Sequence, residues 1–437
     1  MVDKYTKSEK FLDEGLVIST TDKLTANPKL ETKPEEALET TVFEVGVGGS
    51  IASHPEIYNN KIYFGSCDHY FYCLDIKTGK VVWKFETNGI IVSCPKFENG
   101  VVFFGSYDKN LYAIDAETGK KIWTFETDSP IYCSPNTYNG IVYIGSLGGT
   151  FYAIKIDTGK LLWKFHTGNA IISYPEVCDD KVFFGSYNNK LYVLDCKTGD
   201  IRLVYKTGGA ILTDMLCVDG IIYFGSNDKW VYALDAKLCS LKWKYRGTSA
   251  IFLSSYATYK NYIYFTSWDR SLCCIDKDMG KVKWVYKLGD NAISGTRIYE
   301  GVVYVGSMDK NLYAINAETG QLIRKFGTKD MVTTSPVFKD GILYFGSWDC
   351  NLYAITTQGE LKWKFTTSNP RPSTVNIDPA DFESKQPKFV LESTSLKSPD
   401  LYREQKIQDG IGGSVYGSKS SHYIKKSKYT GSESKYR

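Results

Sequence analysis

The chain has 437 residues, a net charge of +4 and 15% aromatic residues, 33 of them tyrosines. A charge this small over this length gives no argument for a nucleic-acid-binding protein. Residues 1–10 carry charges without the apolar run of a signal peptide, and no later stretch approaches the roughly 18 apolar residues of a membrane span. We therefore expect a cytoplasmic protein without membrane insertion.

Cysteine and histidine usage argues against a metal site. The eleven cysteines share no recurring position, and only four histidines occur. No Cys-x-x-Cys or Cys/His spacing suggests zinc, and an odd number of cysteines favours reduced thiols. We predict neither a metal ion nor a cofactor.

Residues 1–40 are polar, with Lys, Glu and Thr predominating and with interruptions at Pro28 and Pro34. This composition predicts a disordered N-terminal segment.

Residues 41–367 form a repeat array. An aromatic residue followed by Gly-Ser recurs, and the glycine or its substitute advances by 40 residues in every step but one, which is 41. The eight positions are Gly65, Gly105, Gly145, Gly185, Gly225, Thr266, Gly306 and Gly346. Eight copies of one unit predict a repeat architecture rather than two or three ordinary domains.

The copy around Gly105 shows the expected secondary structure. Residues 90–97, 101–106, 111–115 and 121–125 are extended, apolar or aromatic stretches separated by turn residues, with Asn99-Gly100 suited to a two-residue hairpin. Each unit is therefore a four-stranded antiparallel meander. Such a sheet with two apolar faces must pack against its neighbours at about 10 Å, which predicts an all-β, eight-bladed β-propeller. The glycine lies where neighbouring blades crowd together, although Thr266 departs from this rule.

Two strands compete to close the ring. Residues 41–45 lie one period before residues 81–85 and resemble an extra fourth strand, whereas residues 361–365 follow their own third strand through a tight turn. We favour the local hairpin, which leaves residues 41–47 as an added edge or lead-in.

The stretch from Ala113 to Trp123, AIDAETGKKIW, resembles the tryptophan-docking motif of quinoprotein dehydrogenase-type propellers, the PQQ-like repeat. Equivalent tryptophans are Trp83, Trp163, Trp243, Trp284 and Trp363, while Leu203 and Arg324 replace the residue in two copies. The resemblance implies that each indole lies over the next blade and donates to a backbone carbonyl there.

The resemblance does not extend to chemistry. In the quinoprotein enzymes, long excursions between strands hold the quinone and its calcium ion, and the regular 40-residue spacing leaves no room for them. The adjacent Cys273 and Cys274 invite comparison with the vicinal disulfide of those enzymes, but alternate side chains of a strand point to opposite faces, which favours two reduced core thiols. Trp268-Asp269 and Trp348-Asp349 do not mark WD repeats, because these dipeptides occur in two copies only and in the wrong turn.

The turn after Gly-Ser provides candidate binding residues. The residue two after the serine is Asp68, Asp108, Gly148, Asn188, Asp228, Asp269, Asp309 or Asp349. These carboxylates either cap their own turns or form a mildly acidic rim. The residue before them is aromatic in every second copy. The candidate partner-binding rim comprises Tyr107, Tyr187, Trp268, Trp348, Asp108, Asp269 and Asp349. We favour packing over adjacent turns for these aromatic side chains, with exposed anchors of a protein-binding surface as the alternative.

A second candidate site lies near the propeller axis. The Ser-x-Pro motif of the innermost strands varies among the copies. The non-repeating polar residues nearest the axis are His54, Tyr174, Asp214 and Arg297. A channel mouth is a usual place for a small ligand.

After residue 367 the periodicity ends. Residues 368–437 are rich in Ser, Lys and Tyr and predict a disordered basic tail. Its regularly spaced tyrosines leave a docking or nucleic-acid-stacking role open. The sequence as a whole favours a non-enzymatic protein-interaction scaffold or sensor. The alternative is a quinone-type small-ligand protein or redox enzyme that uses the channel mouth.

Overall fold

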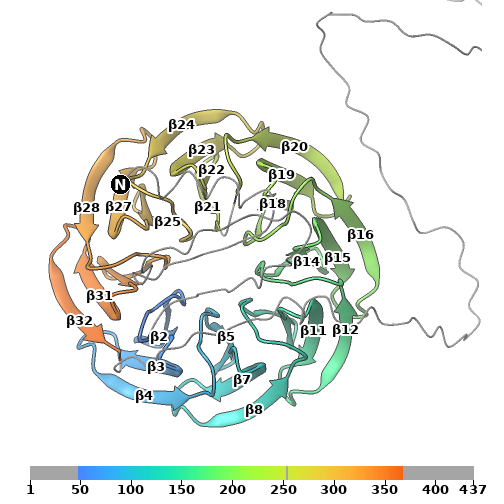
Figure 1. The fold of residues 1–437 in the computed structure, drawn as a ribbon, viewed down its shortest axis with the longest axis horizontal. Coiled ribbons are helices and arrows are strands. Elements are labelled where there is room, and N and C mark those ends of the chain that lie inside the picture. Colours follow the sequence, from blue (N-terminus) through green and yellow to red (C-terminus); the bar gives the residue numbers. More distant parts are fainter. Residues whose placement is uncertain (1–47, 252–253, 368–437) are drawn as a thin grey trace, which may run out of the picture. The chain divides into compact units, whose positions relative to one another are not determined.

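The computed structural model describes residues 48–251 and 254–367, which form eight four-stranded antiparallel sheets around a central axis (Figure 1). The predicted all-β, eight-bladed propeller is confirmed. The predicted disordered segments 1–40 and 368–437 and the lead-in at 41–47 lie outside the described residues.

Each blade runs from a short innermost strand to a long outermost one. Blades 1 to 4 contain β1 (Glu56–Tyr58), β2 (Lys61–Gly65), β3 (Tyr70–Asp75), β4 (Val81–Glu86); β5 (Lys96–Glu98), β6 (Val101–Gly105), β7 (Asn110–Asp115), β8 (Lys121–Glu126); β9 (Asn136–Tyr138), β10 (Ile141–Gly145), β11 (Thr150–Lys155), β12 (Leu161–His166); and β13 (Glu176–Cys178), β14 (Lys181–Ser186), β15 (Lys190–Asp195), β16 (Ile201–Lys206). Blades 5 to 8 contain β17 (Leu216–Val218), β18 (Ile221–Gly225), β19 (Trp230–Asp235), β20 (Ser240–Arg246); β21 (Ala257–Tyr259), β22 (Tyr262–Ser267), β23 (Ser271–Asp276), β24 (Val282–Lys287); β25 (Arg297–Tyr299), β26 (Val302–Gly306), β27 (Asn311–Asn316), β28 (Leu322–Gly327); and β29 (Val337–Lys339), β30 (Ile342–Gly346), β31 (Asn351–Thr356), β32 (Leu361–Thr366).

The innermost strands are shorter than predicted. In blade 2 the expected strand 90–97 is confined to β5, because the residues before it bond to neighbouring blades instead of to a ladder. The Ile91 amide donates to the Ser66 carbonyl (3.2 Å), and the Cys94 amide donates to Ser134 Oγ (2.7 Å). Pro95 then has no N–H to offer. The predicted hairpin is correct, with Asn99 and Gly100 at φ 51° and 82°.

Glycine after the second strand permits close blade packing. A Cβ atom on Gly105 would lie 2.2 Å from Ile131 Cγ2 of the next blade, and an Ile or Val occupies this place at every equivalent glycine. Thr266 replaces the glycine only where the facing residue is Ala292, whose carbonyl accepts from Thr266 Oγ1 (3.1 Å). The smaller partner therefore explains the exception.

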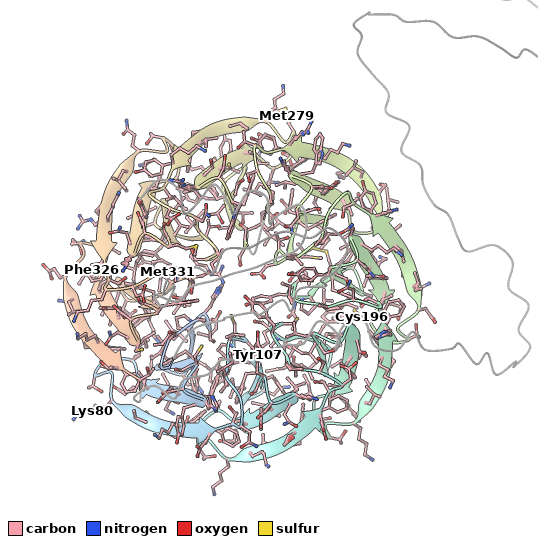
Figure 2. All side chains as sticks on the ribbon, viewed as in Figure 1. Lys80, Tyr107, Cys196, Met279, Phe326 and Met331 are labelled. Carbon is pink, nitrogen blue, oxygen red and sulfur yellow. A yellow bond between two sulfur atoms is a disulfide. The ribbon has the colours of Figure 1, made fainter. Side chains whose placement is uncertain are left out.

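The docking tryptophans join consecutive blades as the resemblance implies. Each of the six indole Nε1 atoms donates to a backbone carbonyl of the next blade, at 2.7–3.1 Å. The indole also covers the glycine of that blade's turn, so a Cβ on Gly119 would lie 2.7 Å from Trp83. Side chains fill the space between the sheets, as in the stacked Phe71 and Phe104 rings, whose centroids are 4.0 Å apart (Figure 2).

The same contacts close the ring. Trp363 of blade 8 donates to the carbonyl of Ile76 in blade 1 (3.1 Å), and β32 pairs with β31 of its own blade. Thr367 Oγ1 donates to the Gly49 carbonyl (2.6 Å). The predicted local hairpin is thus confirmed.

Candidate functional site

The rim carboxylates cap their own turns. In blade 2, one oxygen of Asp108 accepts from the Asn110 amide (3.0 Å), and the other accepts from the Tyr112 hydroxyl (2.7 Å) and from the Asn88 amide (3.0 Å). The same turn bond recurs at Asp68, Asp228, Asp269, Asp309 and Asp349. The capping interpretation is therefore confirmed, and these groups are already engaged within the fold.

Asp269 also forms an ion pair with Lys287, at 2.9 Å. Burial alone would raise the pKa of Asp269, but hydrogen bonds from Thr248, Lys287 and Ser271 outweigh it and lower this pKa to about 2. The group is therefore a carboxylate over the physiological pH range, which suits a structural role better than proton transfer.

The aromatic rim residues turn toward the axis. Tyr107 and Trp348 are each only 6% exposed, and Trp348 Nε1 donates to Thr333 Oγ1 (2.7 Å). Tyr107 belongs to an apolar cluster against which Tyr187 and Trp268 are partly buried. Packing, the interpretation favoured from the sequence, is thus confirmed for Tyr107 and Trp348, and the alternative of exposed anchors is wrong for these two residues. Whether the rim binds a partner stays a prediction.

The channel candidates do come together. The His54 and Tyr174 ring centroids are 6.4 Å apart, and Cys94 links them: its Sγ accepts from the His54 amide (3.2 Å) and lies 3.5 Å from the Tyr174 hydroxyl. Asp214 accepts a short hydrogen bond from the Ser255 hydroxyl. These residues come from blades 1, 2, 4, 5 and 6, so the ring alone assembles them.

The pKa of His54 is shifted by its burial and by the charged residues around it. Its burial lowers the pKa to about 4, assisted by Arg297 and opposed by Asp214 and Glu56. Burial likewise raises the pKa of Asp214. Histidine at this position is therefore neutral near pH 7, and the predicted residues share one electrostatic environment.

The sequence reasoning missed a second layer of channel residues. The first residue of the innermost strand varies among the blades: it is Glu56, Lys96, Asn136, Glu176, Leu216, Ala257, Arg297 and Val337. Asn136 Nδ2 donates to Glu176 Oε2 (3.3 Å). Burial raises the pKa of Glu176 to about 7, although Lys96 opposes the shift. Variation at a fixed repeat position was the signal that could have revealed this layer.

These charges have little direct compensation. Among residues 48–251 and 254–367, no ion pair joins the five charged members of the two layers: Glu56, Lys96, Glu176, Asp214 and Arg297. Within the same residues, no group of three or more His, Cys, Asp or Glu side chains could hold a metal ion. The arrangement can bind and orient a polar group, but it presents no set of metal ligands.

The cysteines are mostly the reduced thiols that were predicted. Cys273 and Cys274 are both free and buried. Cys178 and Cys217 are an exception, because a disulfide joins them across the seam between blades 4 and 5. The two residues occupy different repeat positions on adjacent strands, a proximity that chain order alone conceals.

The family described as outer membrane protein assembly factor BamB, a PQQ-type repeat family, matches residues 31–164, 133–200, 173–289 and 248–380. The chain belongs to this PQQ-repeat family. No curated protein matches the sequence. The propeller and its docking tryptophans are therefore the shared features of the family in this chain. Within the described residues, no helix could span a lipid bilayer.

Three solved structures share the fold. The computationally designed Ika8 protein is 20% identical, with 72% of this chain and 98% of that chain covered and a TM-score of 0.64. BamB from Moraxella catarrhalis is 17% identical, with 72% and 96% covered and a TM-score of 0.60. Quinohemoprotein alcohol dehydrogenase from Comamonas testosteroni is 14% identical, with 77% and 78% covered and a TM-score of 0.60. The PQQ-repeat fold thus serves both an assembly factor and enzymes.

Proposed function

We propose that this PQQ-repeat protein is a non-enzymatic scaffold that binds protein partners through the outer surface of its propeller. The observation that carries this proposal is a band of exposed apolar side chains on the outermost strands. The members are at least 41% exposed and lie on the outermost strands of seven blades, except for two in the turn before that strand in blades 5 and 6. The strand residues are Val81, Val82, Ile122, Leu161, Leu162, Ile201, Val282, Val285, Leu322, Ile323 and Leu361, and the turn residues are Leu238 and Met279. Exposed apolar surface is a feature of interaction sites. The match to an assembly-factor family points in the same direction.

The band is most prominent at the outer edge of blades 5 and 6. Leu238 and Met279 are 72% and 59% exposed, and they occupy a turn position where other blades carry a threonine or Gln358. Met279 lies on the perimeter of the ring (Figure 2). Both turns flank β20, because Leu238 lies two residues before it and Gly280 lies against Trp243 of that strand. Two apolar residues thus replace polar ones beside the same edge strand.

The backbone of β20 adds a second recognition element. Within residues 48–251 and 254–367 this strand pairs only with β19, so its outer edge has N–H and C=O groups that an extended peptide could match. A partner with an apolar, extended segment fits this surface.

The experiment is affinity capture with the full-length chain carrying Leu238→Glu and Met279→Glu. We expect the variant to lose partners that the native chain retains. The matched control carries Thr158→Glu and Gln358→Glu, at the same exposed turn position in blades 3 and 8. Equal partner recovery by all three proteins would contradict the proposal. Changing Trp268 or Trp348 to Ala tests the rim separately, and unchanged partners would remove the rim.

A second candidate function is binding of a small polar ligand in the channel, favoured by the five charged side chains there that form no ion pair within the described residues. Pyrroloquinoline quinone with Ca²⁺ is the first probe, and binding should raise the melting temperature. The rise should disappear in Arg297→Met. No shift at saturating probe would exclude this ligand. A cytoplasmic location and nucleic-acid binding through the tail stay predictions.

A further inference from the structure

The seam between blades 4 and 5 departs from the docking pattern of the ring. At seven seams a long side chain, Trp in six and Arg324 in one, lies over a glycine of the next blade. Between blades 4 and 5 the two positions are Leu203 and Cys239, which pack in one cluster. Cys239 keeps the left-handed backbone of the missing glycine, with φ 52°. This seam therefore lacks both the indole and its hydrogen bond.

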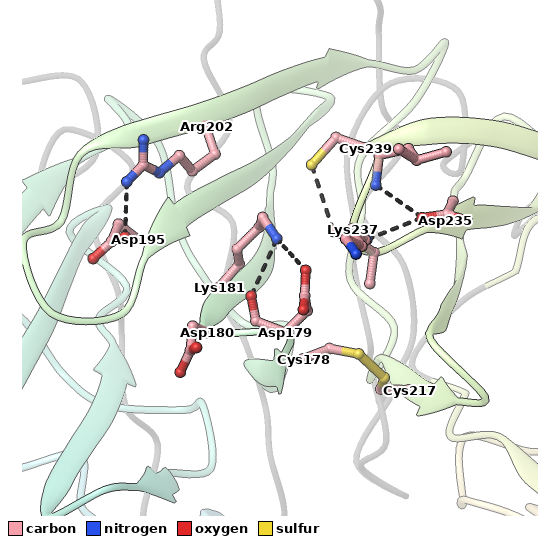
Figure 3. Close-up of polar contacts among 12 residues, drawn as sticks. Cys178, Asp179, Asp180, Lys181, Asp195, Arg202, Cys217, Asp235, Lys237 and Cys239 are labelled. Atoms are coloured by element: carbon pink, nitrogen blue, oxygen red, sulfur yellow. Dashed lines mark hydrogen bonds and ion pairs between the residues drawn. A yellow bond between two sulfur atoms is a disulfide. The ribbon is translucent and has the colours of Figure 1, made fainter.

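A cysteine pair spans the same seam near the axis. Cys178 ends β13 of blade 4 and Cys217 lies in β17 of blade 5, with their Cα atoms 6.2 Å apart and their sulfurs bonded (Figure 3). The separation is within the range that disulfides span. Equivalent positions at two other seams hold stacked aromatic pairs, Tyr58 with Phe97 and Tyr299 with Phe338. The covalent bond thus occupies a place where other blades use packing.

Solvent access distinguishes these sulfurs from the rest. Seven of the eleven cysteines are buried free thiols, whereas Cys178, Cys217, Cys239 and Cys350 are only partly buried. Three of those four lie at the blade 4–5 seam and pack against one apolar cluster. Figure 3 shows Lys181 near this seam, paired at 2.6 Å with Asp179, the residue after Cys178. Small oxidants and reductants therefore reach this seam more readily than the core thiols.

We propose that the blade 4–5 seam is a reversible thiol–disulfide site. The Cys178–Cys217 bond near the axis compensates for the tryptophan dock that this seam lacks. A low-molecular-weight disulfide such as glutathione disulfide forms the bond. One deprotonated cysteine attacks glutathione disulfide and releases one glutathione. The second cysteine then displaces the other glutathione. The protein pair loses two electrons and two protons, and glutathione disulfide is reduced to two glutathiones.

The expected consequence is a ring whose weakest seam depends on redox state. With the bond formed, blades 4 and 5 are held both near the axis and by the apolar cluster. With the bond reduced, this seam keeps the apolar cluster, which includes Leu203 and Cys239, but loses its covalent link near the axis. The inference concerns the ring itself and does not depend on the proposed partner surface.

The test compares the full-length chain equilibrated with glutathione disulfide or with a reducing agent. Differential thiol labelling and peptide mass spectrometry should find Cys178 and Cys217 linked in the first case and free in the second. The oxidised chain should melt about 3–6 °C higher. Hydrogen exchange should accelerate on reduction in β13 and β17 more than in the equivalent β5 and β9.

Variants separate this pair from its neighbours. Cys178→Ser and Cys217→Ser should each abolish the redox-dependent melting shift, while Cys350→Ser, the matched partly buried cysteine of blade 8, should keep it. Cys239→Ser should also keep it. Free Cys178 and Cys217 at saturating glutathione disulfide, a disulfide to Cys239 instead, or identical melting of the two native forms would overturn the proposal. The native comparison requires no variant to fold.

Discussion

Gly105 and Ile131 illustrate how single residues set the spacing of the blades. The isoleucine methyl group occupies the space that a Cβ on the glycine would need, and the same pairing recurs around the ring. Thr266 and Ala292 are the reciprocal solution, with the larger residue on the other side. Each pair therefore conserves volume across the seam, as close-packed interiors require.

This complementarity predicts coupling between the two positions. Gly105→Ala should destabilise the protein by about 1–3 kcal/mol through overpacking. Ile131→Ala should cost about 2–5 kcal/mol through a cavity. The double variant should cost less than the sum, because the new methyl group fills part of the space left by the isoleucine. Urea denaturation of all four proteins measures the coupling, and strict additivity would show that the pair does not interact.

Burial of Glu176 should make the stability of the folded protein depend on pH. Burial raises its folded-state pKa from 4.5 to about 7, so the folded protein binds a proton that the unfolded chain releases in that interval. The Glu176 contribution to stability is therefore lost as pH rises from about 4.5 to 7. Relative to the native protein, Glu176→Gln should gain on the order of 1–3 kcal/mol over this interval. The glutamine can still accept from Asn136. Parallel stability profiles of the two proteins would contradict this assignment.

At the scale of the element, the outermost strand of each blade is a connector as well as an edge. The alternation of β8 places Trp123 and Phe125 on its inward face, where the indole bonds to the next blade and the phenylalanine ring meets Tyr152 edge to face. The strand thus joins its own sheet by backbone bonds and the next sheet by side chains.

Loss of one indole hydrogen bond should lower the stability of the protein by a similar amount at each of the six seams that have a docking tryptophan, including the closing seam. Trp123→Phe and Trp363→Phe should each destabilise by about 1 kcal/mol, because the ring keeps its apolar contact but loses a donor to a buried carbonyl. Trp230→Phe, on β19 outside the docking motif, is the control and should change stability by less than about 0.5 kcal/mol. Denaturant titration provides the comparison. A far larger effect at Trp363 would mean that closure differs from the other seams.

At the scale of the molecule, the propeller is a closed ring, and the position at which the chain enters it does not set the arrangement of the blades. Gly49 and Thr367 are joined by a hydrogen bond of 2.6 Å, so the beginning and end of the described propeller meet at one seam. The other seven seams have no chain break; five use a docking Trp, one uses Arg324, and the blade 4–5 seam has Leu203 and Cys239. Order in the ring therefore depends on neighbour contacts rather than on where the chain enters.

A circular permutant follows from this equivalence. Joining residue 367 to residue 48 by a short flexible linker and opening the chain between Asp157 and Thr158, in an exposed turn, should retain the propeller. The permutant should melt within a few degrees of a chain of residues 48–367 that keeps the native order. Circular dichroism and thermal melting provide the measurement. A permutant that aggregates while the reference chain folds would show that entry at blade 1 is required.

The repeat, the four-stranded blade, the number of blades and the docking tryptophans could all be predicted from the amino-acid sequence. These features depend on local periodicity and turn chemistry, which are written along the chain, as Asn99-Gly100 and the Thr118-Gly119 turn show. The sequence also indicated that His54, Tyr174, Asp214 and Arg297 lie near the axis.

Which residues of different blades are in contact near the axis, and which are buried there, follows from the tertiary structure alone. The ring places Glu176 beside Asn136, links Cys178 to Cys217 and buries Tyr107 and Trp348. These are contacts between blades, separated by about one repeat or more in sequence. Their existence depends on how each sheet rotates about the axis, which the pattern within a single repeat does not specify.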